Sequence, residues 1–199
     1  MVDNFELRRQ IFHIFLGTSI VLLLFFEIFN AKILFMLLLT GSLLSFISRE
    51  IKIPGIDWFL KKFERGGNIK KFPGRGAIFF IVGCLLVVKL FDRDIALASI
   101  MVLTFGDSVS HLFGLYFGKI KHPLNGLKKI EGNIFGSIAG GFMAMFFVNY
   151  IWAFSGAFIA MFIEAIEVKM GNNIIDDNIL IPLIAGTIMY IFKTGFLFF

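Results

Sequence analysis

The sequence predicts an all-α integral membrane protein that crosses the bilayer about seven times, and three observations support this fold class. The chain has 199 residues, 58% of them hydrophobic, and a mean hydropathy of +0.87, which is far from the composition of a soluble domain. Several apolar runs approach the roughly 20 residues that a helix needs to cross a bilayer. The charged residues are concentrated between these runs. Because no linker or short-period repeat divides the chain, we expect a single membrane domain over 1–199.

Seven apolar segments are the expected membrane helices. Asn30 separates the first two and Asp92 the third and fourth, so tight turns connect these pairs. The sixth segment is short and carries Glu164 and Glu167, and a re-entrant or tilted pair is the alternative for the fifth and sixth. The segments are 10–29, 31–48, 77–91, 94–117, 134–154, 155–168 and 179–198.

The distribution of basic residues predicts the orientation. Fifteen of the nineteen Lys and Arg residues either precede the first segment or lie within 49–76, 118–133 and 169–178. With seven spans, all of these regions lie on the same side of the membrane. Since cytoplasmic loops carry an excess of Lys and Arg, we expect a cytoplasmic N-terminus and two cytoplasmic loops, 49–76 and 118–133. The expected location is the cell membrane, as a multi-pass protein.

Several classes of protein are excluded by what the sequence lacks. The one cysteine, Cys84, lies in an apolar run, which excludes an intrachain disulfide and a cysteine metal site. The sequence contains no P-loop, serine-hydrolase elbow or zinc motif. The basic loops have no interleaved aromatic residues, so nucleic acid is not an expected partner. The sequence specifies no oligomeric state.

A carboxylate inside the fourth segment is the strongest indication of function. Asp107 lies roughly ten residues, or ~15 Å, from the cytoplasmic end of that helix, and charge at membrane depth is costly and usually functional. Asp107, Ser110, His111, Gly114 and Gly118 recur every three or four residues, so we expect them to share one helix face. The glycines on this face would let another backbone approach closely.

The combination of a deep carboxylate and a cation at the mouth suits a metal-bound polyphosphate. The metal would meet Asp107, and the phosphates would meet Lys119. The alternative is a helix-packing face on which Asp107 pairs with a basic residue.

Other polar residues are expected to converge on the same cavity, open to the cytosol. His13 lies about one turn inside the first segment and shares a face with Arg9. Glu131 and Gly132 begin the fifth segment, where a helix N-terminus next to lysines attracts anions. The run 176–178 before the last segment either caps that helix or holds Mg²⁺.

These stretches together resemble the CTP-dependent lipid-alcohol kinases, the family of dolichol kinase, phytol kinase and yeast-type diacylglycerol kinase. The run ELRRQIFH (6–13) is similar to the family's Arg-Lys-x-x-His element, with Gln10 where a lysine is usual. The run from Gly106 to Gly132 is similar to the proposed CTP-binding segment, with Ser110 and Lys129 as small departures. FER (63–65) and GRG (74–76) look like the middle loop, and Glu164 with DDNILIPL (176–183) looks like the closing elements.

The resemblance implies CTP as the phosphoryl donor, Mg²⁺ or another divalent metal, and a membrane lipid alcohol as the acceptor. We expect transfer of the γ-phosphate to dolichol or another polyprenol, with phytol, geranylgeraniol and diacylglycerol left open. One alternative is a CDP-lipid synthase, a cytidylyltransferase that uses CTP and a lipid phosphate, but its C-terminal signature is not found here. The other is a small transporter, for which two related halves are expected and not seen.

Each candidate residue then receives an expected role, and His111 receives none. Asp107 and His13 are the expected catalytic residues, with Asp107 the favoured base. The expected nucleotide- and phosphate-binding residues are Arg9, Arg65, Gly114, Gly118, Lys119, Lys128, Glu131 and Gly132. The expected metal ligands are Asp107, Glu131 and Asp177, and the supporting residues are Glu64, Glu164, Asp176 and Asn178.

Overall fold

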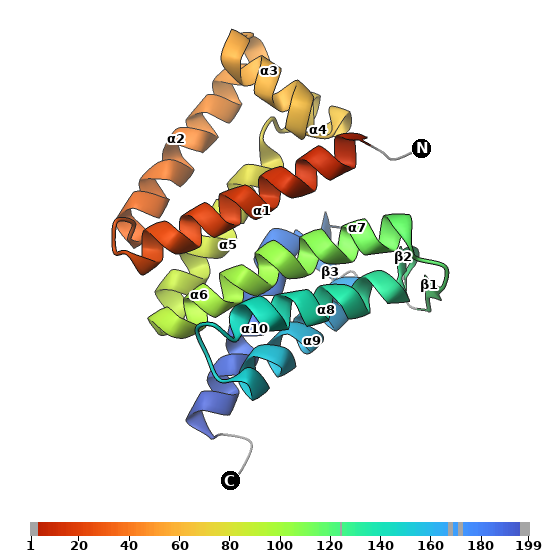
Figure 1. The fold of residues 1–199 in the computed structure, drawn as a ribbon. Helices are drawn as coiled ribbons and strands as arrows, with labels where there is room; N and C mark the ends of the chain where they lie inside the picture. The colour runs from red at the N-terminus through yellow and green to blue at the C-terminus, as the bar shows by residue number, and fades with distance from the viewer. Residues whose placement is uncertain (1–3, 124, 167–168, 171–172, 196–199) are drawn as a thin grey trace.

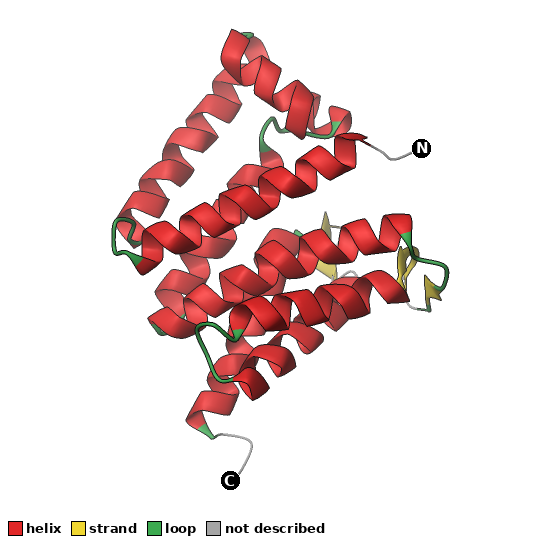
Figure 2. Cartoon of the chain, viewed as in Figure 1, coloured by secondary structure: helices red, strands yellow, loops and turns green. Residues whose placement is uncertain are grey.

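The protein is a bundle of helices with two short β-hairpins (Figures 1 and 2). The structure, a computed structural model, describes residues 4–195 apart from 124, 167–168 and 171–172. The expected helical fold class is confirmed. The helices are α1 (Asn4–Phe25), α2 (Ala31–Glu50), α3 (Pro54–Phe63), α4 (Gly66–Lys71), α5 (Arg75–Leu90), α6 (Arg93–Met101), η1 (Val102–Asp107), α7 (Ser108–Tyr116), α8 (Ile130–Ala144), α9 (Tyr150–Ile166) and α10 (Asp177–Thr194). The strands are β1 (Lys121–His122), β2 (Asn125–Lys129), β3 (Lys169–Met170) and β4 (Asn173–Ile174), paired antiparallel as β1–β2 and β3–β4.

Within the residues that the structure describes, three helical stretches are long and apolar enough to cross a membrane. They are α1, α2 and the continuous helix Arg93–Tyr116, which is formed by α6, η1 and α7. Helix α9 is apolar but shorter. Many large apolar side chains on these helices are exposed, among them Phe15 at 68% and Phe46 at 67%, as expected for surfaces that contact lipid. The chain is therefore a membrane protein, and the seven spans with a cytoplasmic N-terminus remain a prediction.

The boundary between the expected fifth and sixth segments was misplaced. The structure ends α8 at Ala144 and begins α9 at Tyr150, whereas the sequence predicted one helix over 134–154. The side chain of Asn149 accepts a hydrogen bond from the backbone N–H of Ile151 (2.9 Å) and so starts α9. Hydropathy hid this break because the turn 145–149 is itself rich in apolar residues.

The two regions expected as loops contain ordered elements. The segment 49–76 forms α3 and α4, and the segment 118–133 contains the β1–β2 hairpin. Helix α3 is amphipathic: Phe59 and Phe63 pack on Phe12 of α1, with ring centroids 5.0 and 4.9 Å from that ring. Trp58, next to Phe59 in the sequence, is 60% exposed. An amphipathic helix of this kind is suited to lie along a membrane surface.

Small residues bring η1 and α7 directly against α8. A Cβ atom at Gly136 would lie 2.6 Å from the carbonyl oxygen of Gly106, and a Cβ at Gly132 would lie 2.4 Å from that of Ser110. Both distances are too short for real contacts, so only glycine fits. The glycines of α8 thus form a small face that packs on η1 and α7, as small-residue interfaces do between membrane helices.

The turns of the bundle gather at its two ends. The turn after α1, the turn before α6 and the turn between α8 and α9 lie at one end (Figure 1). There Arg93 pairs with Glu27 at 3.0 Å, and the rings of Phe25 and Phe147 lie 6.2 Å apart. The N-terminus of α1 and the β1–β2 hairpin lie toward the other end, and most of the charged candidate residues are near it.

Candidate active site

Asp107 is the last residue of a π-helical turn inside a long helix. The segment η1 replaces the usual i→i+4 pairing with i→i+5, a rare arrangement that is frequent at functional sites. Asp107 and His111 face α1, whereas Gly106 and Ser110 face α8. The expected single face of the fourth segment is therefore split in two, a carboxylate and imidazole face and a small-residue face.

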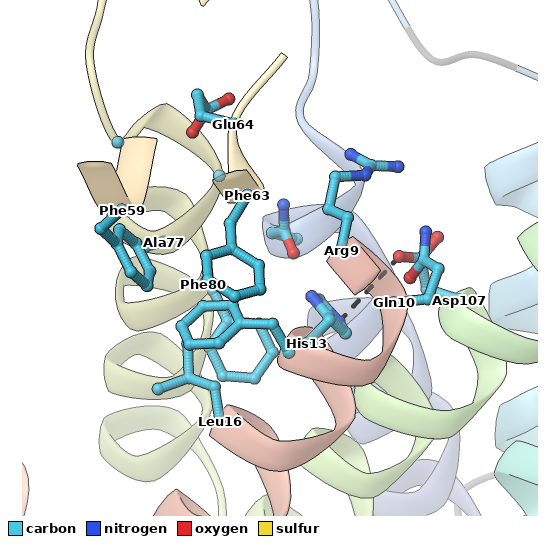
Figure 3. A pocket seen from close by; sticks show the side chains of 14 residues that line it. Arg9, Gln10, His13, Leu16, Phe59, Phe63, Glu64, Ala77, Phe80 and Asp107 are labelled. Atoms are coloured by element: carbon cyan, nitrogen blue, oxygen red, sulfur yellow. Dashed lines mark ion pairs between the residues drawn. The ribbon is translucent and has the colours of Figure 1, made fainter. Parts of the chain in front are cut away.

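His13 is the partner of Asp107 across the interface between α1 and η1. Its Nε2 atom lies 4.0 Å from Oδ2 of Asp107, and its ring lies edge-on to Phe80 of α5 at 4.8 Å (Figure 3). The approach of α1 depends on Gly17, since a Cβ there would lie 2.0 Å from Oγ1 of Thr104 in η1. The structure thus brings the two expected catalytic residues together.

Glu6 joins three cationic or potentially cationic side chains beside this pair, and we call Glu6, Arg9, Arg65 and His111 the Glu6 cluster. The carboxylate of Glu6 lies 2.9 Å from Nε of Arg9, 3.3 Å from Nε of Arg65 and 3.1 Å from Nε2 of His111. Arg65 follows α3, Arg9 lies on α1 and His111 on α7, so the cluster ties three separate parts of the chain together. Its side chains are partly exposed, and such groups are suited to bind an anion.

A second cluster surrounds Lys128 at the end of β2, and we call Lys128, Glu164 and Asp177 the Lys128 cluster. The ammonium of Lys128 pairs with the buried carboxylate of Glu164, donates to the carbonyl oxygen of Glu164 at 2.9 Å and lies 3.5 Å from Oδ2 of Asp177. Glu164, expected as a supporting residue in the sixth segment, is buried. Its role in the structure is to fix Lys128.

Asp107 lies close enough to the Lys128 cluster to influence its charges. Burial disfavours the charged form of Lys128, but the carboxylates of Glu164, Asp177 and Asp107 outweigh burial and raise the pKa of this lysine. Burial, together with Asp107 and Asp176, raises the pKa of Asp177 to about 6 despite the attraction of Lys128. Asp107 also precedes His111 of the Glu6 cluster by one helical turn. It is therefore near both clusters.

The run 176–178 forms the start of α10. Asp176 caps the helix, because its Oδ1 accepts hydrogen bonds from the backbone N–H (3.2 Å) and side-chain amide (2.9 Å) of Asn178. Its other oxygen pairs with Arg75 at 3.2 Å. A Cβ at Gly83 of α5 would lie 2.0 Å from the carbonyl oxygen of Asn178, so α5 holds this helix start in direct contact. The cap, predicted for either Asn or Asp, is made by Asp176.

Several other expected residues serve the local structure. The carboxylate of Glu131 accepts backbone N–H bonds from Lys119 (2.9 Å) and Ile120 (3.0 Å), which fastens the loop after α7 to the start of α8. Backbone N–H groups, its own first and then those of Lys119 and Ile120, lower the pKa of Glu131. Gly118 packs on the side chain of Lys129, and the side chain of Lys119 is exposed. Their expected phosphate and metal roles stay predictions.

Mg²⁺ fits this region only as an ion that protein carboxylates and substrate phosphates would hold together. Among the described residues, no group of three His, Cys, Asp or Glu side chains is arranged to hold a metal ion. Mg²⁺ is usually held by one or two carboxylates, several waters and substrate phosphates. Asp107 and Asp177 meet that requirement, because their side chains are 25% and 39% exposed and lie near the same lysine.

Two residues of the site were missed by reasoning from the sequence. Glu6 was read only as part of the N-terminal element, and His111 received no role. A signal was present for both: Glu6 lies three residues before Arg9 on one helix face, and His111 lies four residues after Asp107. What the sequence did not show is that the two faces meet.

The fold and the site define an integral membrane protein with clustered charges near one end of its helix bundle. The chain is 30% identical over 188 residues to an uncharacterised protein of Methanocaldococcus jannaschii, and the alignment covers 92% of each chain. It is 25% identical over 139 residues to the CTP-dependent diacylglycerol kinase 1 of Schizosaccharomyces pombe, and 25% identical over 206 residues to the probable phytol kinase 2, chloroplastic, of Oryza sativa subsp. japonica. These two alignments cover 61% and 89% of this chain but only 62% and 63% of the two kinases.

No protein-family model matches the chain, and no solved structure gives a significant match. From the relatives, the chain belongs to the family of CTP-dependent lipid kinases.

Proposed function

We propose that this protein is an integral-membrane kinase that transfers the γ-phosphate of CTP to the hydroxyl group of a membrane lipid alcohol. The acceptor we propose is an isoprenoid alcohol of the polyprenol or dolichol type. The site faces the cytoplasm, where CTP is available. One observation carries the proposal: Asp107 faces His13 one helical turn from His111 of the Glu6 cluster, and its charge also acts on Lys128.

The names of the relatives support the two substrates. The fission-yeast relative is named as CTP-dependent and acts on diacylglycerol, and the rice relative is named for phytol. The chemistry common to both names is a lipid that carries a hydroxyl group. We extend to this chain the donor named for the first relative and the acceptor class shared by the two.

The cationic side chains would bind the triphosphate. Phosphoryl transfer depends mainly on positioning and on neutralising charge in the transition state. Arg9 and Arg65 present guanidinium groups, which bind phosphate oxygens in pairs, and Lys128 presents an ammonium whose raised pKa keeps it charged at neutral pH. Glu164 holds Lys128 in position before the nucleotide arrives, and Glu6 neutralises Arg9 and Arg65 until phosphate takes its place.

The reaction exchanges one phosphorus–oxygen bond for another. The lipid oxygen forms a bond to the γ-phosphorus while the bond from that phosphorus to the β,γ-bridging oxygen breaks, and CDP leaves. The hydroxyl proton passes to the carboxylate of Asp107, which lies at the surface of the site rather than in the sealed core. A bound Mg²⁺, held by Asp107 and Asp177, would supply charge neutralisation on the phosphates.

Labelled nucleotide tests this proposal directly. Purified protein in detergent receives a mixed extract of polyprenols and diacylglycerols, Mg²⁺, and CTP labelled at either the γ- or the α-phosphate. We expect label in lipid from the γ position only, with the labelled product identifying the alcohol. Label from the α position instead would mean cytidylyl transfer, and no label from either position would refute a CTP-dependent transferase.

A further inference from the structure

A narrow cavity with aromatic walls adjoins the catalytic pair. It has a volume of about 90 Å³ and lies between α1, α3 and α5, with the start of α10 and Asp107 at its polar end (Figure 3). Phe80 of α5 is fully buried, and the other aromatic walls come from α1 and α3. The apolar lining residues are Phe12, Leu16, Phe59, Phe63, Ala77 and Phe80.

The polar end of this cavity contains buried atoms that have no partner. Nε2 of His13 and Oδ1 of Asn178 are both buried, and neither has a hydrogen-bond partner within the part of the chain that the structure describes. Buried polar atoms are nearly always paired, so each unpaired one calls for an explanation. Both residues line the cavity, as does Asp107, whose Oδ2 lies 4.0 Å from Nε2 of His13.

The separation of His13 and Asp107 suits a hydroxyl group placed between them. At 4.0 Å the two atoms are too far apart to bond each other. An oxygen atom at about 2.8 Å from each would complete two hydrogen bonds of ordinary length. It would accept one from the N–H of His13 and donate its own proton to the carboxylate of Asp107.

We propose that this cavity binds the hydroxyl end of a lipid alcohol that has a single hydrocarbon chain. This inference rests on the proposed function and adds to it the place and the shape of the acceptor. An apolar cavity of ~150 Å³ is known to hold a benzene ring, so about 90 Å³ admits the first carbons of one chain. Diacylglycerol would place two ester groups and two chains at this point, and a volume of about 90 Å³ leaves no room for both chains.

The route from the bilayer to this cavity lies along α1 and α3. On α1, Ile11 and Phe15 are 56% and 68% exposed and form the edge next to the cavity-facing Phe12 and Leu16. On α3, Phe59 faces the cavity and its neighbour Trp58 is exposed. The ring of Trp58 lies 4.7 Å from Nζ of Lys62. A helix with aromatic and lysine side chains on its outer face is typical of a membrane surface. A lipid alcohol can therefore enter sideways, with its hydroxyl group leading.

Photocrosslinking tests the cavity without relying on catalysis. The wild-type protein in detergent is irradiated with a long-chain primary alcohol that carries a diazirine near its hydroxyl end, and the modified residues are found by mass spectrometry. We expect crosslinks to the lining residues of α1, α3 and α5, which geranylgeraniol abolishes and dioleoylglycerol does not. Crosslinks confined to other helices, or equal competition by dioleoylglycerol, would overturn the proposal.

Kinetics provide the matched second measurement. Phe59→Ala should raise the KM for geranylgeraniol about tenfold, equivalent to ~1.4 kcal/mol, and leave the KM for CTP unchanged. Phe46→Ala, an exposed phenylalanine of α2 that does not line the cavity, should change neither. An unchanged KM for the alcohol in Phe59→Ala would contradict the cavity as the acceptor site.

Crosslinking, together with the transfer of labelled γ-phosphate, separates this inference from the proposed function. Crosslinks at the cavity without γ-phosphate transfer to any lipid would leave the alcohol site standing and refute the kinase. Transfer of the γ-phosphate with crosslinks elsewhere would uphold the kinase and refute the cavity.

Discussion

Asp107 is the residue through which the parts of the site are connected. It lies opposite His13, one turn before His111 of the Glu6 cluster, and near Lys128. A carboxylate in this position can accept a proton from an alcohol and can also contribute to holding a metal. Either use would be lost if the charge were removed.

Substitution of Asp107 by asparagine should abolish most of the activity and leave the fold intact. The amide has nearly the same size but accepts no proton, and removal of a general base typically costs 10²- to 10⁴-fold in rate, an order-of-magnitude range. The measurement is the initial rate of label transfer from γ-labelled CTP. Asp57→Asn, which alters a surface pair with Lys61 on α3, is the control and should retain the wild-type rate. Near-normal turnover of Asp107→Asn would rule out its role.

Removal of the charge of Glu6 should strengthen binding of CTP. In the free protein this carboxylate neutralises Arg9, Arg65 and His111 and therefore competes with phosphate. We expect Glu6→Gln to lower the dissociation constant of CTP about fivefold, or ~1 kcal/mol, with a steeper dependence on salt. Equilibrium binding of labelled CTP measures this, with Glu50→Gln on the exposed end of α2 as control. Weaker binding would mean that Glu6 positions the cations instead.

Single residues were predictable from the sequence where placing them among apolar residues is energetically costly. Asp107 and Glu164 stand out because a charge among apolar residues needs an explanation. The partners of Glu6 were not predictable, because Arg65 is 59 residues away in the chain and only the packing of α3 on α1 brings it near. Sequence spacing reports which residues share a helix face, and it does not report which faces meet.

At the scale of elements, the contact of α8 with η1 and α7 is governed by glycine. Gly136→Ala would place a methyl group 2.6 Å from both the carbonyl oxygen of Gly106 and the Cβ of Ser110. Overpacking of this kind typically costs about 1–3 kcal/mol, so we expect a lower melting temperature in detergent. Gly126→Ala, whose Cβ would meet nothing within 4 Å, should melt as the wild type does. Equal melting temperatures for the two variants would contradict the close approach.

Lys128 fastens the β1–β2 hairpin to α9 and α10. Lys128→Met would leave the buried carboxylate of Glu164 without its partner, and breaking a buried pair from one side costs about 3–5 kcal/mol. Thermal melting should show this loss, and adding Glu164→Gln to the same chain should recover part of it. Lys121→Met, at an exposed position of β1, is the control. A double variant no more stable than Lys128→Met would argue against the pair.

The boundaries of elements were predictable where turn chemistry marked them. Asn30 accepts hydrogen bonds from Lys32 and Ile33 and caps α2 where the sequence placed a turn. The break between α8 and α9 was missed because apolar residues occupy the turn and only the cap at Asn149 marks it. Helices α3 and α4 were missed because a basic segment with several glycines is typical of a loop.

At the scale of the whole molecule, the arrangement of turns makes the orientation testable. The β1–β2 hairpin and the turn before α9 lie toward opposite ends of the bundle (Figure 1). Cys84 is fully buried, so an added cysteine would react against a low background. In whole cells, we expect a membrane-impermeant maleimide to label Tyr150→Cys directly and Gly126→Cys only after permeabilisation. Labelling of both cysteines without permeabilisation would contradict the seven-span topology. Direct labelling of Gly126→Cys alone would mean that the orientation in the membrane is reversed.

The number of residues in the helix Arg93–Tyr116 is constrained as strongly as the identity of any residue in it. The π-helical turn at 102–107 changes the rotational register between α6 and α7, and each residue of an α-helix turns the chain by about 100°. Deletion of one codon within this turn would keep the reading frame and still swing Asp107 and His111 away from α1. The glycine contacts with α8 would move out of line in the same step. Homologues should therefore accept substitutions in this segment more readily than insertions or deletions, and an alignment gap here would mark a protein whose site is built differently.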